Sequence, residues 1–201
     1  MRKMLLMVMA VLAIAGFSNA ATNLLSNSSF ESHADDGYGR EMPTGYGLWT
    51  EGWNWGVIPN TEVITTDART GSASFQMDGT TSGAAVALTY TLGQLPVGYY
   101  HVGGWFKGAG TNSIIGVDMF APDWSAWYWG DGSSLAGISA TEWTYVGFDF
   151  QVTDPTVQFN FVVKNTAGSC PAFLVDDVVA VPEPLTLSIL ALGGLFLRNR
   201  K

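Results

Sequence analysis

One short segment of this chain brings aromatic and acidic side chains together. Between Pro122 and Asp131 it holds four aromatic residues, Trp124, Trp127, Tyr128 and Trp129. Flat rings can stack on the C–H faces of sugars, while carboxylates orient the sugar hydroxyls. In an extended segment Trp127 and Trp129 point to the same side, with Asp131 beside them. We therefore expect these three residues to bind carbohydrate; the alternative is that the loop folds back and buries its own rings.

A second pair of tryptophans has a similar setting. Trp53 and Trp55 flank Asn54 between two glycines, and we count both as candidate carbohydrate-binding residues. Other aromatic residues fall at alternating positions of expected strands, where one face of a sheet is buried. These we assign to the core: Trp105, Trp143, Phe148, Phe150, Phe159 and Phe161.

The sequence gives little support for catalysis. It contains two histidines, His33 and His101, and none of the common serine-hydrolase, zinc-protease or cysteine–histidine motifs. The lone cysteine, Cys170, has no histidine nearby in the sequence to activate it. A glycoside hydrolase that uses two carboxylates is the remaining enzymatic possibility. We expect a protein that is not an enzyme.

The composition excludes several classes of partner. Hydrophobic residues make up 47% of the 201 residues and charged residues 13%, which is not the composition of a disordered chain. All but one of the 17 acidic residues lie between Ala21 and Val181, but only four of the nine basic ones do. Such a segment repels phosphate backbones, so nucleic acid is excluded as a partner. It favours neutral or cationic ligands and divalent cations.

The elements that would position these residues are strands. Apolar residues recur with a period of two, and 24 glycines supply turns. The runs Val146–Val152 and Val157–Val163, separated by Asp154-Pro155, are expected to form an antiparallel pair. We predict an all-β, antiparallel β-sandwich of the jelly-roll type. The expected strands are Leu24–Glu31, Leu48–Trp55, Glu62–Thr66, Ala73–Asp78, Val86–Leu92, Tyr99–Lys107, Asn112–Phe120, Val146–Val152, Val157–Val163 and Ala172–Ala180.

Five segments resemble, in the same order, landmarks of the jelly-roll carbohydrate-binding modules found beside bacterial cellulases and xylanases. They are Asn23–Glu31, Thr70–Phe75, Leu95–Lys107, Thr141–Tyr145 and Phe173–Val178. The first reads Asn-Leu-Leu-Ser-Asn-Ser-Ser-Phe-Glu and the last Phe-Leu-Val-Asp-Asp-Val. The resemblance implies a galactose-binding-like jelly roll over nearly all of residues 21–181. That fold hosts many ligands, so it implies less about the sugar.

The same resemblance implies a structural calcium ion. Carried over by position, its side-chain ligands are Glu31 and Asp176, and the turn Thr70–Ser72 would add backbone carbonyls. A hard cation of this kind takes about six to eight oxygen ligands. The alternative is that these carboxylates only cap strand ends in solvent.

The two ends of the chain resemble targeting signals. Residues 1–20 have a basic start, an apolar run and a small-residue exit, as a secretory signal peptide cleaved after Ala20 does. Residues 182–201 place Pro182, Glu183 and Pro184 before an apolar run and a basic tail. This order resembles the PEP-CTERM sorting signal of Gram-negative, often biofilm-forming bacteria, which implies processing by an exosortase. A plain membrane anchor is the alternative.

Taken together, the sequence predicts an exported, exosortase-processed protein of the cell surface or extracellular matrix of a Gram-negative-type bacterium. Its expected partners are polysaccharide or exopolysaccharide, signal peptidase and exosortase, with only transient membrane contact through the C-terminal segment. The leading function is non-catalytic polysaccharide binding by a domain at 21–181. The alternative is a structural biofilm-matrix protein without a specific glycan ligand.

Overall fold

The computed structural model describes residues 21–50, 60–78, 85–121, 123, 127–165 and 171–183, and the side chains of 127–129 lie outside this description. The strands in this part are β1 (His33–Asp35), β2 (Glu41–Pro43), β3 (Gly47–Thr50), β4 (Glu62–Ile64), β5 (Ser74–Met77), β6 (Val86–Gln94), β7 (Gly98–Gly108), β8 (Ser113–Phe120), β9 (Trp127–Ser134), β10 (Thr144–Val152), β11 (Gln158–Asn165) and β12 (Phe173–Pro182). No helix among the described residues is long and apolar enough to cross a membrane.

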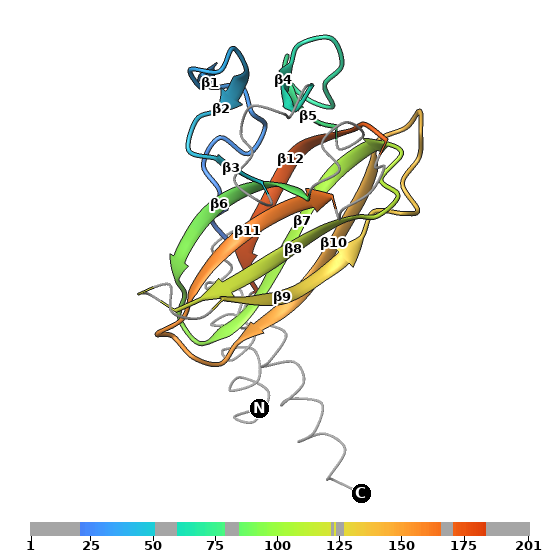
Figure 1. Cartoon of the computed structure of the whole chain (residues 1–201). Coiled ribbons are helices and arrows are strands. Elements are labelled where there is room, and N and C mark those ends of the chain that lie inside the picture. The colour runs from blue at the N-terminus through green and yellow to red at the C-terminus, as the bar shows by residue number, and fades with distance from the viewer. Residues whose placement is uncertain are drawn as a thin grey trace, which may run out of the picture.

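Ten of these strands form two antiparallel sheets that pack face to face. The front sheet has the order β3-β6-β11-β8-β9, and the back sheet has the order β10-β7-β12-β5-β4 (Figure 1). The strands β1 and β2 pair separately, near the end of the sandwich where β4 and β5 lie (Figure 1). The prediction of an all-β antiparallel sandwich is confirmed for the described residues.

The core lies between the two sheets, and the alternation of side chains along each strand builds it. In β7, Tyr100, Val102 and Phe106 point inward and are buried. In β11, Phe159 and Phe161 do the same from the front sheet. Because neighbouring residues of a strand point to opposite faces, the residues between them must lie on the outer faces of the sandwich.

The prediction that residues 146–163 form an antiparallel hairpin is wrong. Strand β10 pairs with β7 in the back sheet, whereas β11 pairs with β6 and β8 in the front sheet. The turn at Asp154, whose carboxylate accepts hydrogen bonds from the Thr156 amide and hydroxyl, therefore carries the chain from one sheet to the other. Both runs bury their apolar face in the same core, so their alternation does not distinguish a hairpin from such a crossing.

The prediction of a first strand at Leu24–Glu31 is also wrong. Residues 24–29 form turns, and Asn27 and Phe30 have positive φ angles of 51° and 59°. The segment still lies beside β12, because the Leu24 amide donates to the Ala180 carbonyl and the Val178 amide donates to the Ser28 carbonyl. Phe30 is fully buried against Phe75. Glu31 thus follows a buried turn rather than the end of a strand.

Candidate functional site

The outer face of the back sheet carries a row of aromatic and polar side chains from β7 and β10. On β7, alternation leaves His101, Gly103 and Trp105 on this face. The register of the antiparallel pair sets Tyr145 opposite Trp105 and Asp149 opposite His101, with Gly147 opposite Gly103. We call Trp105, Tyr145 and His101, with the two glycines beneath them, the aromatic face.

The three rings of the aromatic face are in contact. The Tyr145 and Trp105 ring centroids lie 5.4 Å apart in an edge-on arrangement, and the His101 ring stacks on Tyr145 at 6.1 Å with an interplanar angle of 12°. The Tyr145 hydroxyl lies 2.7 Å from His101 Nε2. Tyr145 remains 42% exposed. Burial of its hydroxyl, and then the nearby Asp149 carboxylate, raises the pKa of Tyr145, so the hydroxyl stays protonated.

Two glycines make room for this arrangement. A Cβ atom at Gly103 would overlap the Tyr145 hydroxyl, and one at Gly147 would lie 2.9 Å from both His101 Nε2 and the Val102 carbonyl oxygen. Any larger residue at either position would push the rings away from the sheet. The aromatic face therefore depends on glycine at both opposed positions.

A cation covers part of Trp105. The Arg69 guanidinium lies 3.8 Å from the centroid of the Trp105 ring and forms an ion pair of 2.5 Å with Asp177. This position of Arg69 gives cation–π stabilisation and fixes the tryptophan. Trp105 is half-buried and lies outside the core cluster, and Trp143 is likewise half-buried, so their assignment to the core is wrong. The other four assigned residues lie in the core or pack against it.

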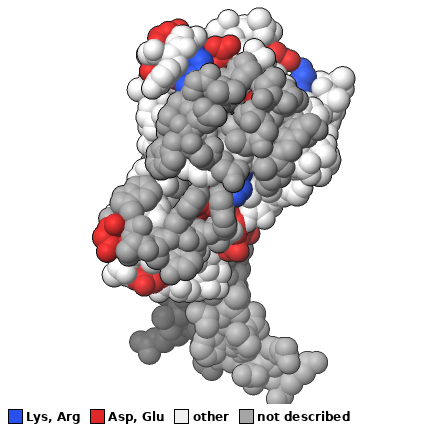
Figure 2. Space-filling model, viewed as in Figure 1, with Lys and Arg blue, Asp and Glu red and all other residues white. Residues whose placement is uncertain are grey.

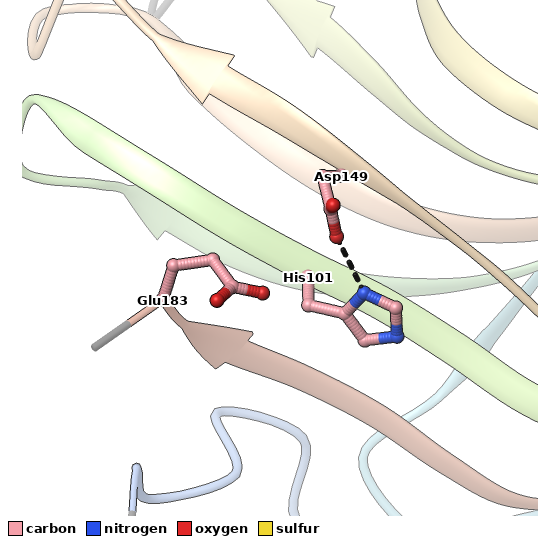
Figure 3. A group of neighbouring side chains, drawn as sticks. All are labelled: His101, Asp149 and Glu183. Carbon is pink, nitrogen blue, oxygen red and sulfur yellow. Dashed lines mark hydrogen bonds and ion pairs between the residues drawn. The ribbon is translucent and has the colours of Figure 1, made fainter. Parts of the chain in front are cut away.

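A histidine and two carboxylates lie at the other end of the aromatic face. His101 Nδ1 is 2.6 Å from Asp149 Oδ1. Glu183 follows β12, and its amide donates to the Tyr99 carbonyl, which brings its side chain next to His101 (Figure 3). One ligand atom from each of the three residues lies within 4.8 Å of the others. The sequence does not reveal this group, because its members are far apart in the chain.

The two expected calcium ligands, Glu31 and Asp176, hold one turn from two sides. Glu31 Oε1 accepts hydrogen bonds from the Ser72 and Ala73 amides, and Oε2 accepts one from the Ser72 hydroxyl. These bonds lower the pKa of Glu31. Gly71, at a φ of +62°, leaves room for the carboxylate, which a Cβ atom there would overlap.

Asp176 lies on the other side of the same turn. Its fully buried carboxylate accepts hydrogen bonds from the Arg69 and Thr70 amides at Oδ2 and from the Asp177 amide at Oδ1. Burial raises the pKa of Asp176 to about 6, against the effect of these bonds. Since a carboxylate oxygen accepts about two hydrogen bonds, Glu31 Oε2 and Asp176 Oδ1 each keep one acceptor site that no described residue fills. These two oxygens fit a cation only if backbone carbonyls supply most of its shell.

Residues 127–131 of the expected aromatic loop belong to a strand. Trp127 and Trp129 belong to β9, the edge of the front sheet, opposite Phe120 and Asp118 on β8. Their side chains lie outside the described part of the chain, while Asp131 is exposed. Trp53, Trp55 and Pro184 also lie outside it. Pro182 ends β12, and Glu183 directly follows it.

Buried polar groups lie on the front sheet beside β9. Asp118 is 5% exposed, and burial raises its pKa to about 6 although the Lys164 ammonium opposes this. Burial likewise lowers the pKa of Lys164. Asn160, opposite Asp118 on β11, has a buried side-chain oxygen without a hydrogen-bond partner among the described residues. A buried polar atom without a partner is an exception in folded proteins and calls for an explanation, such as a bound water or ion.

Comparison with known proteins gives the fold. No protein-family description and no curated protein sequence matches the chain. Solved structures do: a family 16 carbohydrate-binding module has a TM-score of 0.54 and 20% identity, covering 79% of this chain and 99% of that one. The module TmCBM61, solved with β-1,4-galactotriose, has a TM-score of 0.50 and 17% identity, covering 81% and 100%.

The fold is carbohydrate-binding-module-like. Similarity extends to the enzymatically active domain of tailspike protein 4 of bacteriophage CBA120, with a TM-score of 0.55 and 17% identity over 80% of this chain. This chain spans only 21% of that tailspike chain. The fold thus occurs both as a separate module and as part of a larger enzyme. At such low identities the likeness shows the fold and no more.

Proposed function

We propose that this protein binds polysaccharide without catalysing its cleavage. The main support is that the Tyr145 ring is exposed on the aromatic face. The fold that presents this ring is similar to that of carbohydrate-binding modules. One carbohydrate-binding module of similar fold was solved with β-1,4-galactotriose, and another is a xylan-binding domain. Both are neutral glycans, which suits residues 21–181, where acidic residues outnumber basic ones. On the side of the front sheet, Figure 2 shows only a few, scattered Lys and Arg side chains.

The aromatic face offers both kinds of contact that a sugar needs. The exposed part of the Tyr145 ring provides a flat apolar surface for stacking. Around it, the Tyr145 hydroxyl, the exposed Asp149 carboxylate and the Arg69 guanidinium can orient sugar hydroxyls. A row of such groups along two paired strands favours an extended glycan chain over a single sugar.

We propose a second carbohydrate-binding surface at β9, with Trp127, Trp129 and Asp131, and with Trp53 and Trp55 as further contacts. What supports it is the position of β9 beside Asp118 and the unsatisfied Asn160 oxygen. These groups belong to the front sheet, so this surface is separate from the aromatic face.

The test is affinity gel electrophoresis of the full-length chain through a panel of neutral and charged polysaccharides. Retardation by at least one polysaccharide supports the proposal. Mobility unchanged across the panel would favour the structural biofilm-matrix protein instead.

An enzymatic alternative has one observation in its favour. Oxygens of Asp149 and Glu183 lie within 4.8 Å of each other, and retaining glycosidases hold their two carboxyl groups about 5–5.5 Å apart. Release of reducing ends from the polysaccharide panel, abolished by Asp149→Asn, would replace the binding proposal with a glycoside hydrolase.

We further propose that the chain is exported with residues 1–20 as signal peptide, and sorted to the cell surface or matrix through Pro182-Glu183-Pro184 by an exosortase. Glu183→Ala should then leave unprocessed protein in the membrane fraction of a host that has an exosortase. Since Glu183 also lies beside His101, His101→Ala is the matched control: it changes the same cluster but keeps the tripeptide. Equal processing of Glu183→Ala and wild type would refute the sorting proposal.

Structural calcium remains part of the proposal. Its support is that, in the part of the chain that the structure describes, Glu31 Oε2 and Asp176 Oδ1 each accept only one hydrogen bond, on either side of the turn Arg69–Ala73. A bound cation there would tie the N-terminal segment to β12 by linking the two carboxylates.

A further inference from the structure

The group of His101, Asp149 and Glu183 is assembled by three adjacent strands of the back sheet (Figure 3). His101 lies within β7, Asp149 faces it from β10, and Val181 of β12 pairs with His101 on its other side. Glu183 lies two residues beyond Val181, where its amide donates to the Tyr99 carbonyl. Each side chain therefore comes from a separate backbone segment held by sheet hydrogen bonds.

The distances in this group fit a small dication. Zinc-type ions bind imidazole nitrogen and carboxylate oxygen at about 2.0–2.1 Å in a tetrahedron, which sets ligand atoms roughly 3.3 Å apart. Here the separations begin at 2.6 Å, between His101 Nδ1 and Asp149 Oδ1, and all lie within 4.8 Å. Within the described residues the Glu183 carboxylate forms no hydrogen bond or ion pair. Modest rotations of two flexible carboxylates would reach the required spacing.

The second ring nitrogen of His101, Nε2, has a hydrogen-bond partner, as the outer nitrogen of a metal-bound histidine usually does. Nε2 lies 2.7 Å from the Tyr145 hydroxyl, and the two rings are stacked. With the Nε2 hydrogen donated to this hydroxyl, the lone pair of Nδ1 faces the carboxylates. A hydrogen bond to the outer nitrogen fixes the tautomer and the ring orientation of a histidine ligand. This contact is independent of the two carboxylates and points to the same ligand atom.

We propose that His101 Nδ1, Asp149 and Glu183 bind a transition-metal dication of the zinc type. Two carboxylates balance the charge of the ion, and the neutral imidazole selects against calcium and magnesium, which prefer oxygen alone. Asp149 is exposed, so the fourth position is open to water. The site is distinct from the calcium proposal at Glu31 and Asp176. It also does not depend on polysaccharide binding.

A bound ion would link β7, β10 and the residue that follows β12. The end of the described chain is otherwise held at this point by the backbone bond from Glu183 to Tyr99. The ion should therefore protect the C-terminal end of β12 from fraying, which is a local effect rather than a condition for folding.

The test is titration of the metal-free full-length chain with Co²⁺, followed by the visible absorption of bound cobalt, and then displacement by Zn²⁺. One equivalent of Co²⁺ should give d–d bands that Zn²⁺ removes. His101→Ala and Glu183→Gln should each abolish the bands. Tyr145→Phe, which removes only the hydrogen bond to Nε2, should weaken binding by about 10–100-fold.

His33→Ala is the matched control, because His33 Nδ1 also pairs with a carboxylate, that of Glu41 at 3.0 Å, but has no third ligand within reach in the described residues. It should leave the titration unchanged. Circular dichroism melts of every variant check folding. No one-equivalent binding by folded wild type, or equal binding by folded Glu183→Gln, would overturn the proposal.

Discussion

Two regions of this molecule bring carboxylates together, and they differ in what those carboxylates already bind. At the turn Arg69–Ala73, Glu31 and Asp176 accept six hydrogen bonds from N–H and O–H donors of the turn and of Asp177. On the aromatic face, the Asp149 carboxylate pairs with His101, and Glu183 has no such bond among the described residues. The carboxylates at the turn are used mainly to hold the fold, whereas those on the aromatic face keep more acceptor capacity for a ligand.

The largest expected effect is on stability at the turn. Asp176→Ala removes the acceptor of three partly buried amides, and a hydrogen bond to a charged group contributes about 1.5–3 kcal/mol. We expect the free energy of unfolding to fall by about 3 kcal/mol or more, measured by urea denaturation. The matched variant Asp149→Ala, at an exposed position, should cost less than about 0.5 kcal/mol. Equal losses in both variants would remove the distinction between the two regions.

Glycine substitution tests the aromatic face. Gly103→Ala forces a methyl group against the Tyr145 hydroxyl, and overpacking of this kind costs about 1–3 kcal/mol. Gly137→Ala is the control, since nothing lies within 4 Å of its Cβ position. We expect Gly103→Ala to lower the melting temperature and the control to leave it nearly unchanged. Melting temperatures that agree would show that the Tyr145 ring does not rest on Gly103.

The pH dependence of stability separates buried from open carboxylates. The pKa of Asp176 and that of Asp118 are each raised from 3.8 to about 6 in the folded state. Between about pH 4 and pH 6 the folded protein therefore binds more protons than the unfolded chain. The stability that these protons contribute is fully present below about pH 4 and is lost as the pH rises through about 6. The melting temperature should fall between about pH 4.5 and about pH 7, and fall less in Asp118→Asn. An equal fall would exclude Asp118 as a source.

The smallest expected effect is that of calcium. Because the turn keeps its hydrogen bonds without an ion, chelation should lower the melting temperature by only a few degrees, through loss of a ligand that binds the folded state. Glu31→Ala should remove this sensitivity. A melt that is the same with and without chelator would mean that hydrogen bonds alone hold the turn.

The sequence predicted most strand positions but not their partners. Alternation located β7 at Tyr99–Lys107, and the structure has Gly98–Gly108. It did not assign β10 and β11 to different sheets, because pairing depends on contacts distant in the chain. The first expected strand failed for a local reason, since Asn27 and Phe30 adopt positive φ angles that end extended structure.

The candidate site was harder to predict than the fold. Alternation shows that His101, Gly103 and Trp105 share a face, but not which face is buried, and Trp105 was placed in the core for that reason. The site could have been predicted from a second strand, in which Tyr145, Gly147 and Asp149 alternate in the same way and therefore also share one face. Two opposed glycines between polar and aromatic residues indicate an open surface.

The most direct test of polysaccharide binding is the dissociation constant of the polysaccharide that retards the full-length chain most, measured by isothermal titration calorimetry. Tyr145→Ala should weaken binding by about 1–3 kcal/mol, as loss of a central stacking ring does, with little change in melting temperature. Tyr38→Ala, at a tyrosine that is 67% exposed on the β1–β2 hairpin, should bind as wild type does. Unchanged affinity in Tyr145→Ala, with loss in Trp127→Ala, would place the binding site at β9 and contradict its assignment to the aromatic face.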